Sequence, residues 1–282
     1  MRKTQNLRGA RANRAVIANG LTQNLYSNRS IRLNRHRDNQ TMRRDHRPLL
    51  VRRWHEFWAQ WYSRHFIRPQ CEEFGDGIEI IGPRNLELFG PHISIGDYVH
   101  ISTARGTMTR LCTWPNQTGE HGHLKIGNYV LLSPGVHITS AENIHIGDNV
   151  MMASHCYVSD ADWHDLYDRV ASPGKTAPII LEDNVWLGQG AKVLKGVRLG
   201  KNTIVAAGAV VAKSFPANSI IGGNPAKLIS KLDPKKPRRT RASMFADPVK
   251  YKKTMKYIKH LQHKENSFSR WIRSMLWPDN SL

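Results

Sequence analysis

Aliphatic residues recur at every sixth position through the middle of the chain. A period of six fits neither an α-helix nor a simple alternating strand. It fits a short strand followed by a turn, and three such units complete one triangular coil of about 18 residues. The pattern therefore predicts coils whose aliphatic side chains point inward and stack along an axis. The repeat positions are Ile95, Ile101, Ile126, Leu132, Ile138, Ile146, Met152, Val158, Leu181, Leu187, Val193, Leu199, Val205 and Val211.

In the run from Leu181 to Val211, a mostly small residue stands four positions after each of the first five members. Glycine directly follows two members of this run. Small side chains and glycine allow tight corners. Each coil would cover its neighbour, so stability would grow with the number of coils. The predicted fold class is mainly β, a parallel β-helix. An ordinary β-sandwich would not keep a strict six-residue register. The small partners and glycines are Val185, Ala191, Val197, Thr203, Ala209, Gly188 and Gly200.

Residues 78–232 resemble the hexapeptide-repeat acyltransferases, through three segments. These are Val-Trp-Leu-Gly at 185–188, Ala-Ala-Gly-Ala-Val-Val at 206–211 and Gly-Asn-Pro-Ala-Lys at 223–227. The resemblance implies a left-handed coil, an exception to the usual right-handed crossover. It also implies a homotrimer with active sites between neighbouring subunits. The implied reaction moves an acetyl group from acetyl-CoA, as co-substrate, to a hydroxyl of a sugar or glycan precursor, without a metal.

The six-residue register fails over 105–123 and 160–178, which we predict to be loops. Position 164, where the next aliphatic residue is due, holds His164. The segment 159–164 resembles the Ser-Asp…His segment of sugar O-acetyltransferases, but is one residue longer; there a single His is the catalytic base. Imidazole can remove a hydroxyl proton near neutral pH, and Asp160 or Asp162 would orient it. A loop His that only packs or hydrogen-bonds is the alternative.

The same resemblance assigns coenzyme contacts to five residues near the end of the repeat. Lysine ammonium groups bind phosphates as point charges, which suits Lys213 and Lys227 to the nucleotide end of the coenzyme. Solvated surface lysines are the alternative for both. The assigned residues are Gln189, Ala207, Ala212, Lys213 and Lys227.

Two other functions stay open. The gamma-class carbonic anhydrases share this coil and bind zinc through three His. Their close His pair is separated by four residues, whereas eight separate His155 from His164. The second alternative is a non-catalytic trimeric β-helix that binds membrane or a polyanion.

The positive charge of the chain, +20 in total, belongs to its two ends. Residues 1–70 carry +13, residues 234–282 carry +10, and the centre carries −3. Such arms suit anionic lipid or an acidic polymer. Nucleic acid is the less favoured partner, because no recognised nucleic-acid fold accompanies the charge.

Apolar residues at helical spacing predict amphipathic helices in both arms, over 42–77 and 233–282. Their stripes would pack against the coil or a neighbouring subunit; contact with anionic membrane is the alternative. Residues 1–41 lack periodicity, which predicts a disordered basic extension, and Met42 is a second candidate for the true start. The stripes consist of Leu50, Trp54, Phe57, Trp58 and Trp61, and of Tyr251, Met255, Ile258, Phe268, Trp271, Ile272 and Met275.

Three features indicate a cytoplasmic protein, with peripheral contact at the inner face of the membrane as a further option. No run of about 18 apolar residues exists, so a spanning helix is not expected. The basic N-terminal stretch lacks the apolar segment of a secretory signal. Cys71, Cys112 and Cys156 are odd in number and widely spaced, which predicts reduced, mostly buried thiols.

Overall fold

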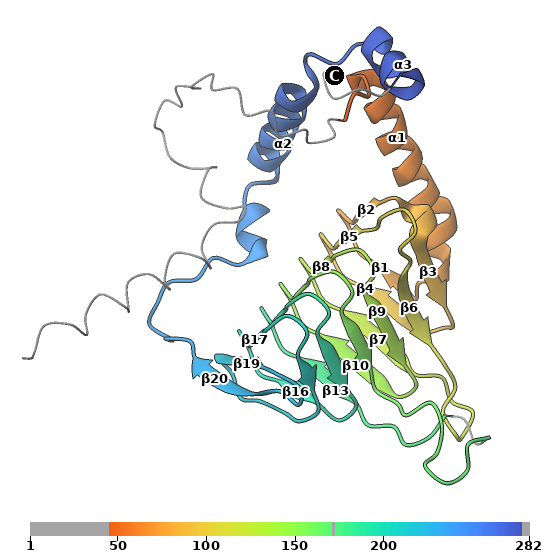
Figure 1. Cartoon of the computed structure of the whole chain (residues 1–282), viewed down its shortest axis with the longest axis vertical. Coiled ribbons are helices and arrows are strands. Elements are labelled where there is room, and N and C mark those ends of the chain that lie inside the picture. Colours follow the sequence, from red (N-terminus) through yellow and green to blue (C-terminus); the bar gives the residue numbers. More distant parts are fainter. Residues whose placement is uncertain (1–44, 171–172, 278–282) are drawn as a thin grey trace, which may run out of the picture. The chain divides into compact units, whose positions relative to one another are not determined.

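The computed structural model describes residues 45–170 and 173–277. Its strands form three sheets, and the chain visits the sheets in turn, so that three strands complete one coil (Figure 1). Paired strands of successive coils are parallel, except for the antiparallel pair β19–β20 that closes the coil. The predicted extension over 1–41 and the alternative start at Met42 lie outside the described residues.

Each sheet runs the length of the coil. Sheet A consists of β1 (Glu73–Phe74), β4 (Ile93–Ile95), β7 (His123–Ile126), β10 (Asn143–Ile146), β13 (Ile179–Leu181) and β16 (Arg198–Leu199). Sheet B consists of β2 (Glu79–Ile81), β5 (His100–Ser102), β8 (Leu131–Leu132), β11 (Met151–Met152), β14 (Trp186–Leu187), β17 (Ile204–Val205), β19 (Ser219–Gly222) and β20 (Lys227–Lys231). Sheet C consists of β3 (Leu86–Phe89), β6 (Thr109–Thr113), β9 (His137–Ser140), β12 (Tyr157–Ser159), β15 (Lys192–Leu194) and β18 (Val210–Val211).

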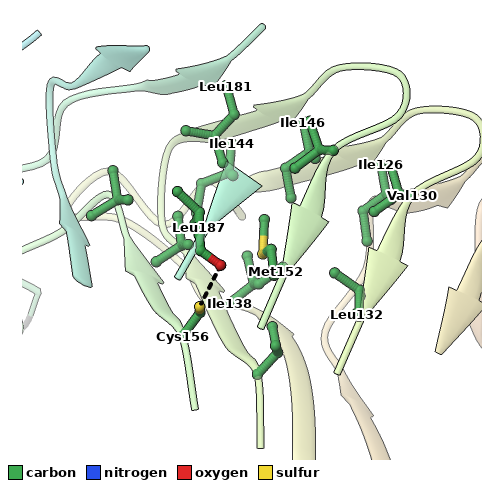
Figure 2. Packing of buried hydrophobic residues seen from close by; sticks show 14 of the residues in the cluster. Ile126, Val130, Leu132, Ile138, Ile144, Ile146, Met152, Cys156, Leu181 and Leu187 are labelled. Carbon is green, nitrogen blue, oxygen red and sulfur yellow. Dashed lines mark hydrogen bonds between the residues drawn. The ribbon is translucent and has the colours of Figure 1, made fainter. Parts of the chain in front are cut away.

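The six-residue repeat builds the interior, as predicted. Its aliphatic side chains are fully buried and belong to one hydrophobic cluster. Figure 2 shows Ile138, Met152 and Leu187 pointing into the shared interior, and the Cys156 thiol close to the Leu187 carbonyl (3.8 Å). The small partners, from Val185 to Ala209, are buried as well. The register of the sequence therefore corresponds to the stacking of the coils.

The prediction of one continuous loop over 105–123 was wrong. Strand β6 lies inside it and pairs with β3 and β9. Leu111 is the one aliphatic residue of this strand, it is fully buried, and it follows Ile101 by ten residues. Because the extra residues before β6 displace the six-residue spacing, the strand was hidden in the sequence. The predicted coil boundary at residue 78 was also late, since β1 begins at Glu73.

A C-terminal segment runs across the corners between sheets A and B. Its 3₁₀ turn (Arg241–Met244) places the Arg241 Nε 2.8 Å from the Tyr129 carbonyl, and Phe245 packs on the rings of Tyr98 and Tyr129. Both tyrosines have positive φ, at 54° and 59°. The sharp left-handed corners thus expose two ring faces that the segment covers.

The N-terminal arm is a helix, as predicted, but most of its apolar stripe does not face the coil. Helix α1 (Leu49–Tyr62) continues through a π turn (Ser63–Ile67) and a 3₁₀ turn (Arg68–Gln70) into the first strand. Trp58 packs beneath Arg84, whose guanidinium lies 4.4 Å from the ring centroid; Arg84 belongs to a further 3₁₀ turn (Pro83–Asn85). Trp54 and Phe57 are 65% and 63% exposed. Most of the stripe is therefore uncovered in the single chain.

The C-terminal arm contains the two predicted helices, α2 (Pro248–His263) and α3 (Phe268–Leu276). Asp247 and Ser267 cap their first turns by accepting backbone N–H bonds, which is the usual N-cap arrangement. Lys259 pairs with Glu56 at 2.7 Å, so the two arms contact each other. Among the described residues, none of the helices has the length and apolar content needed to cross a membrane.

Candidate functional site

The predicted loop over 160–178 is anchored by a buried carboxylate. Asp160 directly follows β12 and is fully buried. Its Oδ1 accepts the backbone N–H of Ala141 (2.7 Å), and its Oδ2 accepts the Ser140 hydroxyl (2.7 Å) and the Glu142 N–H (3.1 Å). Burial raises the pKa of this carboxyl, although these three donors and the Asn143 backbone N–H oppose the shift. Asp160 thus ties the start of the loop to the preceding coil.

Beyond Asp160 the loop leaves the coil and returns as a narrow hairpin. The Asp162 N–H donates to the Lys175 carbonyl (2.9 Å), and the Gly174 N–H donates to the Asp162 carbonyl (2.6 Å). A Cβ at Gly174 would lie 2.5 Å from the His164 carbonyl oxygen, so the turn requires glycine there. The two sides of the hairpin therefore lie in close contact at His164.

The His164 side chain projects into solvent. It is exposed, and within residues 45–170 and 173–277 it makes no hydrogen bond. Asp162, one of the two carboxylates predicted to orient it, pairs instead with Lys195 (2.5 Å). Asp160, the other, is engaged with the preceding coil. The roles of His164, Asp160 and Asp162 in catalysis therefore stay predictions.

The two interruptions of the repeat meet in space. Gln117 Nε2, from the first, donates to the Pro173 carbonyl of the second (3.0 Å). The ring of Trp114 lies edge-on to that of Trp163, with 6.3 Å between centroids. Segments more than forty residues apart thus build one corner, where sheet C turns into sheet A.

Sequence reasoning missed part of this corner. Trp163 Nε1 donates to the Tyr157 hydroxyl (3.4 Å), and the rings of Tyr157 and His137 meet edge to face at 5.3 Å. In the described part of the chain, two buried polar atoms lack a hydrogen-bond partner: His121 Nδ1 and Thr139 Oγ1. Such atoms are uncommon in folded proteins and often mark functional sites. The signal available in the sequence was the aromatic residue directly before His164.

Four of the five residues predicted to hold the coenzyme divide between two corners, and the fifth, Lys227, lies in β20 of sheet B. Gln189 and Ala207 lie where sheet B turns into sheet C, and the Gly208 N–H donates to the Gln189 carbonyl (2.8 Å). Ala212 and Lys213 follow β18, on the side of sheet C that carries the His164 loop. Lys227 opens β20 opposite Gly222. All five are exposed.

A groove of about 370 Å³ lies along sheet A. Its walls include Lys125, His145, Asp148 and Asp183, and none of the predicted site residues. Asp183 accepts the Asp148 N–H (3.1 Å), as Asp148 accepts the N–H of Asn128 (2.7 Å). These carboxylates satisfy corner backbone groups of successive coils. In the described ranges, no three His, Cys, Asp or Glu side chains come together in a way that could hold a metal ion.

The family model described as bacterial transferase hexapeptide (six repeats) matches residues 178–213. A 2,3,4,5-tetrahydropyridine-2,6-dicarboxylate N-acetyltransferase of Staphylococcus aureus is 37% identical over 91 residues, which is 32% of each chain. A probable acetyltransferase of Mycobacterium tuberculosis is 30% identical over 185 residues, covering 64% of this chain and 56% of the relative. The matches thus span about a third to somewhat over half of the relatives' lengths.

Among solved structures, a hexapeptide-repeat acetyltransferase of Vibrio cholerae overlaps 59% of this chain and 77% of its own. The TM-score is 0.40 at 23% identity. That protein has also been solved with acetyl coenzyme A.

The family match lies within the stretch where the six-residue register is unbroken, and the structure shows that register as stacked coils. Residues 178–213 therefore match the hexapeptide repeat of bacterial transferases, and the chain folds as a mainly β, left-handed parallel β-helix with helices at its ends.

Proposed function

We propose that this protein is an acetyltransferase that moves an acetyl group from acetyl-CoA to a hydroxyl of a sugar or glycan precursor, with His164 as general base. One observation carries the proposal: an exposed His stands on a hydrogen-bonded hairpin that interrupts the six-residue repeat directly before the stretch that matches the transferase family model. The relatives named as acetyltransferases support the donor.

The chemistry needs one proton acceptor that later becomes a donor. His164 takes the proton of the acceptor hydroxyl as its oxygen attacks the thioester carbonyl. The resulting tetrahedral intermediate collapses with breakage of the C–S bond, and the imidazolium returns the proton to the coenzyme sulfur. A backbone N–H would stabilise the oxyanion. Asp160 acts here as a positioning residue, because it fixes the start of the hairpin.

The coenzyme would lie along the outer surface of the last coils. Lys213 and Lys227 are exposed cations suited to its phosphates. Gln189, Ala207 and Ala212 would line the path of its pantetheine arm. Since Gln189 and Ala207 lie at one edge of sheet C and Ala212 and Lys213 at the other, we assign the two pairs to coenzyme molecules bound on opposite sides of a subunit, each shared with a neighbour.

A homotrimer would complete the site. His164 projects away from its own coil into solvent, so a wall from a neighbouring subunit would supply the second side of a cleft and exclude water. Mass photometry of the purified full chain would report the trimer as a single species of three times the chain mass.

We further propose a cytoplasmic location with peripheral contact at an anionic membrane. Trp54 and Phe57 are exposed on α1, and the arms carry most of the positive charge. Aromatic side chains beside basic residues are typical of helices that lie in the lipid interface.

Calorimetry with acetyl-CoA, followed by thiol release with a panel of sugars, tests the enzyme proposal. Binding and sugar-dependent thiol release support it. A parallel panel of amines is included because one relative is named as an N-acetyltransferase. Thiol release with amines alone would mean that the acceptor is an amine and not a hydroxyl. Absence of acetyl-CoA binding would favour the non-catalytic β-helix scaffold.

A further inference from the structure

Three aromatic rings form a row beside the His164 hairpin. Phe89 ends β3, Trp114 follows β6, and Trp163 directly precedes His164. Phe89 and Trp114 lie 4.4 Å apart with an interplanar angle of 35°, and Trp163 stands edge-on to Trp114. The row thus joins the coils of β3, β6 and β12 at one end of sheet C, past the coil of β9 that lies between the last two.

The rings are held firmly but are not buried. Phe89 is 45% and Trp114 41% exposed, and Trp163 is half-buried. The hydrogen bond from Trp163 Nε1 to the Tyr157 hydroxyl fixes the indole plane, and the contact of Gln117 with Pro173 ties the two loops together. Contiguous exposed apolar surface, unlike a single exposed ring, is a mark of binding sites.

Polar groups stand next to the row on the outer surface of sheet C. His137 and Tyr157 are opposite each other in register, with Arg110 and Lys192 on the neighbouring strands. Burial, followed by the charge of Arg110, lowers the pKa of His137. A neutral imidazole near pH 7 can both donate and accept a hydrogen bond.

Apolar ring faces beside hydrogen-bonding groups match the chemistry of a pyranose. One face of such a ring carries C–H groups that stack on aromatic rings, while its hydroxyls need donors and acceptors at the rim. The separations between the ring centroids, 4.4 and 6.3 Å, are on the scale of one sugar residue.

We propose that Phe89, Trp114 and Trp163 form the subsite that binds the sugar ring of the acceptor and presents its hydroxyl to His164. The inference rests on the proposed function and narrows its acceptor to a pyranose-containing glycan. The residues that select the acceptor would then lie mainly in the two interruptions of the repeat, 105–123 and 160–178.

The test uses the full chain and oligosaccharides released by mild acid from bacterial exopolysaccharide and lipopolysaccharide, printed as an array. Trp114→Ala and Trp163→Ala are compared with Trp186→Ala, a matched control. Trp186 is 44% exposed, but it lies in β14 of sheet B. We expect each subsite variant to lose roughly tenfold in glycan affinity, the loss of one stacked ring, and the control to bind like wild type.

Three further readouts separate the possible outcomes. Trp114→Phe should recover most of the binding, which a variant that merely misfolds would not show. Calorimetry with acetyl-CoA should give the same affinity for all variants; if wild type fails to bind acetyl-CoA, the proposed function fails while the array still reports on the subsite. Equal glycan binding by the Trp114, Trp163 and Trp186 variants would overturn the inference. So would a change of oligomeric state in Trp114→Ala, which would make the row a subunit contact.

Discussion

Asp160 offers the sharpest test of how the hairpin is held. Replacing it with Ala removes the acceptor of the Ala141 and Glu142 N–H groups and of the Ser140 hydroxyl. The hydroxyl has a second acceptor, the His123 carbonyl at 3.0 Å, to which it can turn. The two backbone N–H groups have no such alternative in the described contacts. The substitution therefore leaves two donors without a partner.

The size of the effect follows from these two donors. Each unpaired buried N–H costs about 1–3 kcal/mol. Removing the carboxylate also relieves its desolvation, which is the cause of its raised pKa, so we take a net loss of about 3 kcal/mol. For a folded unit of about 200 residues this corresponds to a fall in Tm of roughly 6–12 °C. Asp160→Asn keeps one acceptor oxygen and should lose about half as much.

Differential scanning of wild type, Asp160→Ala and Asp162→Asn measures this effect. Asp162→Asn is the matched control, because it removes a carboxylate of the same hairpin whose ion pair with Lys195 is partly exposed. Such pairs contribute about 0–1 kcal/mol, so its Tm should stay within roughly 3 °C of wild type. A Tm for Asp160→Ala equal to that of the control would refute the reasoning.

The raised pKa of Asp160 also predicts the direction in which its contribution to stability changes with pH. Since its folded pKa is raised above the ordinary value of 3.8, the folded protein takes up this proton at higher pH than the unfolded chain does. The contribution to stability is complete below the ordinary pKa and is lost as pH rises through the folded pKa. The difference in Tm between wild type and Asp160→Asn should therefore widen as the pH is lowered from about 7 toward 4.

Three further predictions concern the coil, the thiols and the arm. Gly188→Ala should be strongly destabilising, since its Cβ would lie 2.6 Å from the Ala207 nitrogen. Gly190→Ala, which has open space around it and a φ of 67°, should lower the stability by only about 1 kcal/mol. Equal Tm values for the two variants would contradict the close stacking of the coils at Gly188. Burial raises the pKa of Cys71 to about 12, and it is the largest cause that raises the pKa values of Cys112 and Cys156 to about 11. Iodoacetamide at pH 8 should therefore react slowly with the native protein. In the unfolded protein all three thiols should react, which intact-mass measurement would show as three added labels. Replacing Trp54 and Phe57 with Ser should reduce sedimentation with phosphatidylglycerol vesicles at least tenfold and leave Tm unchanged; undiminished sedimentation would remove α1 from the membrane contact.

The sequence predicted the coil well because one physical rule covers most of it. Inward aliphatic residues every six positions can be counted, and the positions from Leu181 to Val211 are all buried as expected. Strand β6 escaped because inserted residues displaced Leu111 from the count. The helices were also predictable from their periodicity. Which face of α1 would be covered was not, since that depends on contacts such as Trp58 with Arg84.

The candidate site was only partly readable. His164 could be found because it stands where an aliphatic residue was due. The partners of Asp160 could not, because they belong to a coil twenty residues earlier and are brought near by stacking. The meeting of Trp114 with Trp163 likewise depends on the three-dimensional path of two loops.

The most direct test of the central claim compares turnover by wild type and His164→Ala at matched acetyl-CoA occupancy. Removal of a general base reduces kcat by about 10²–10⁴, and the exposed side chain makes no contact that should change folding or coenzyme affinity within the described residues. We expect kcat to fall at least a hundredfold in His164→Ala, with an unchanged Kd for acetyl-CoA. Equal turnover by the two proteins would contradict it.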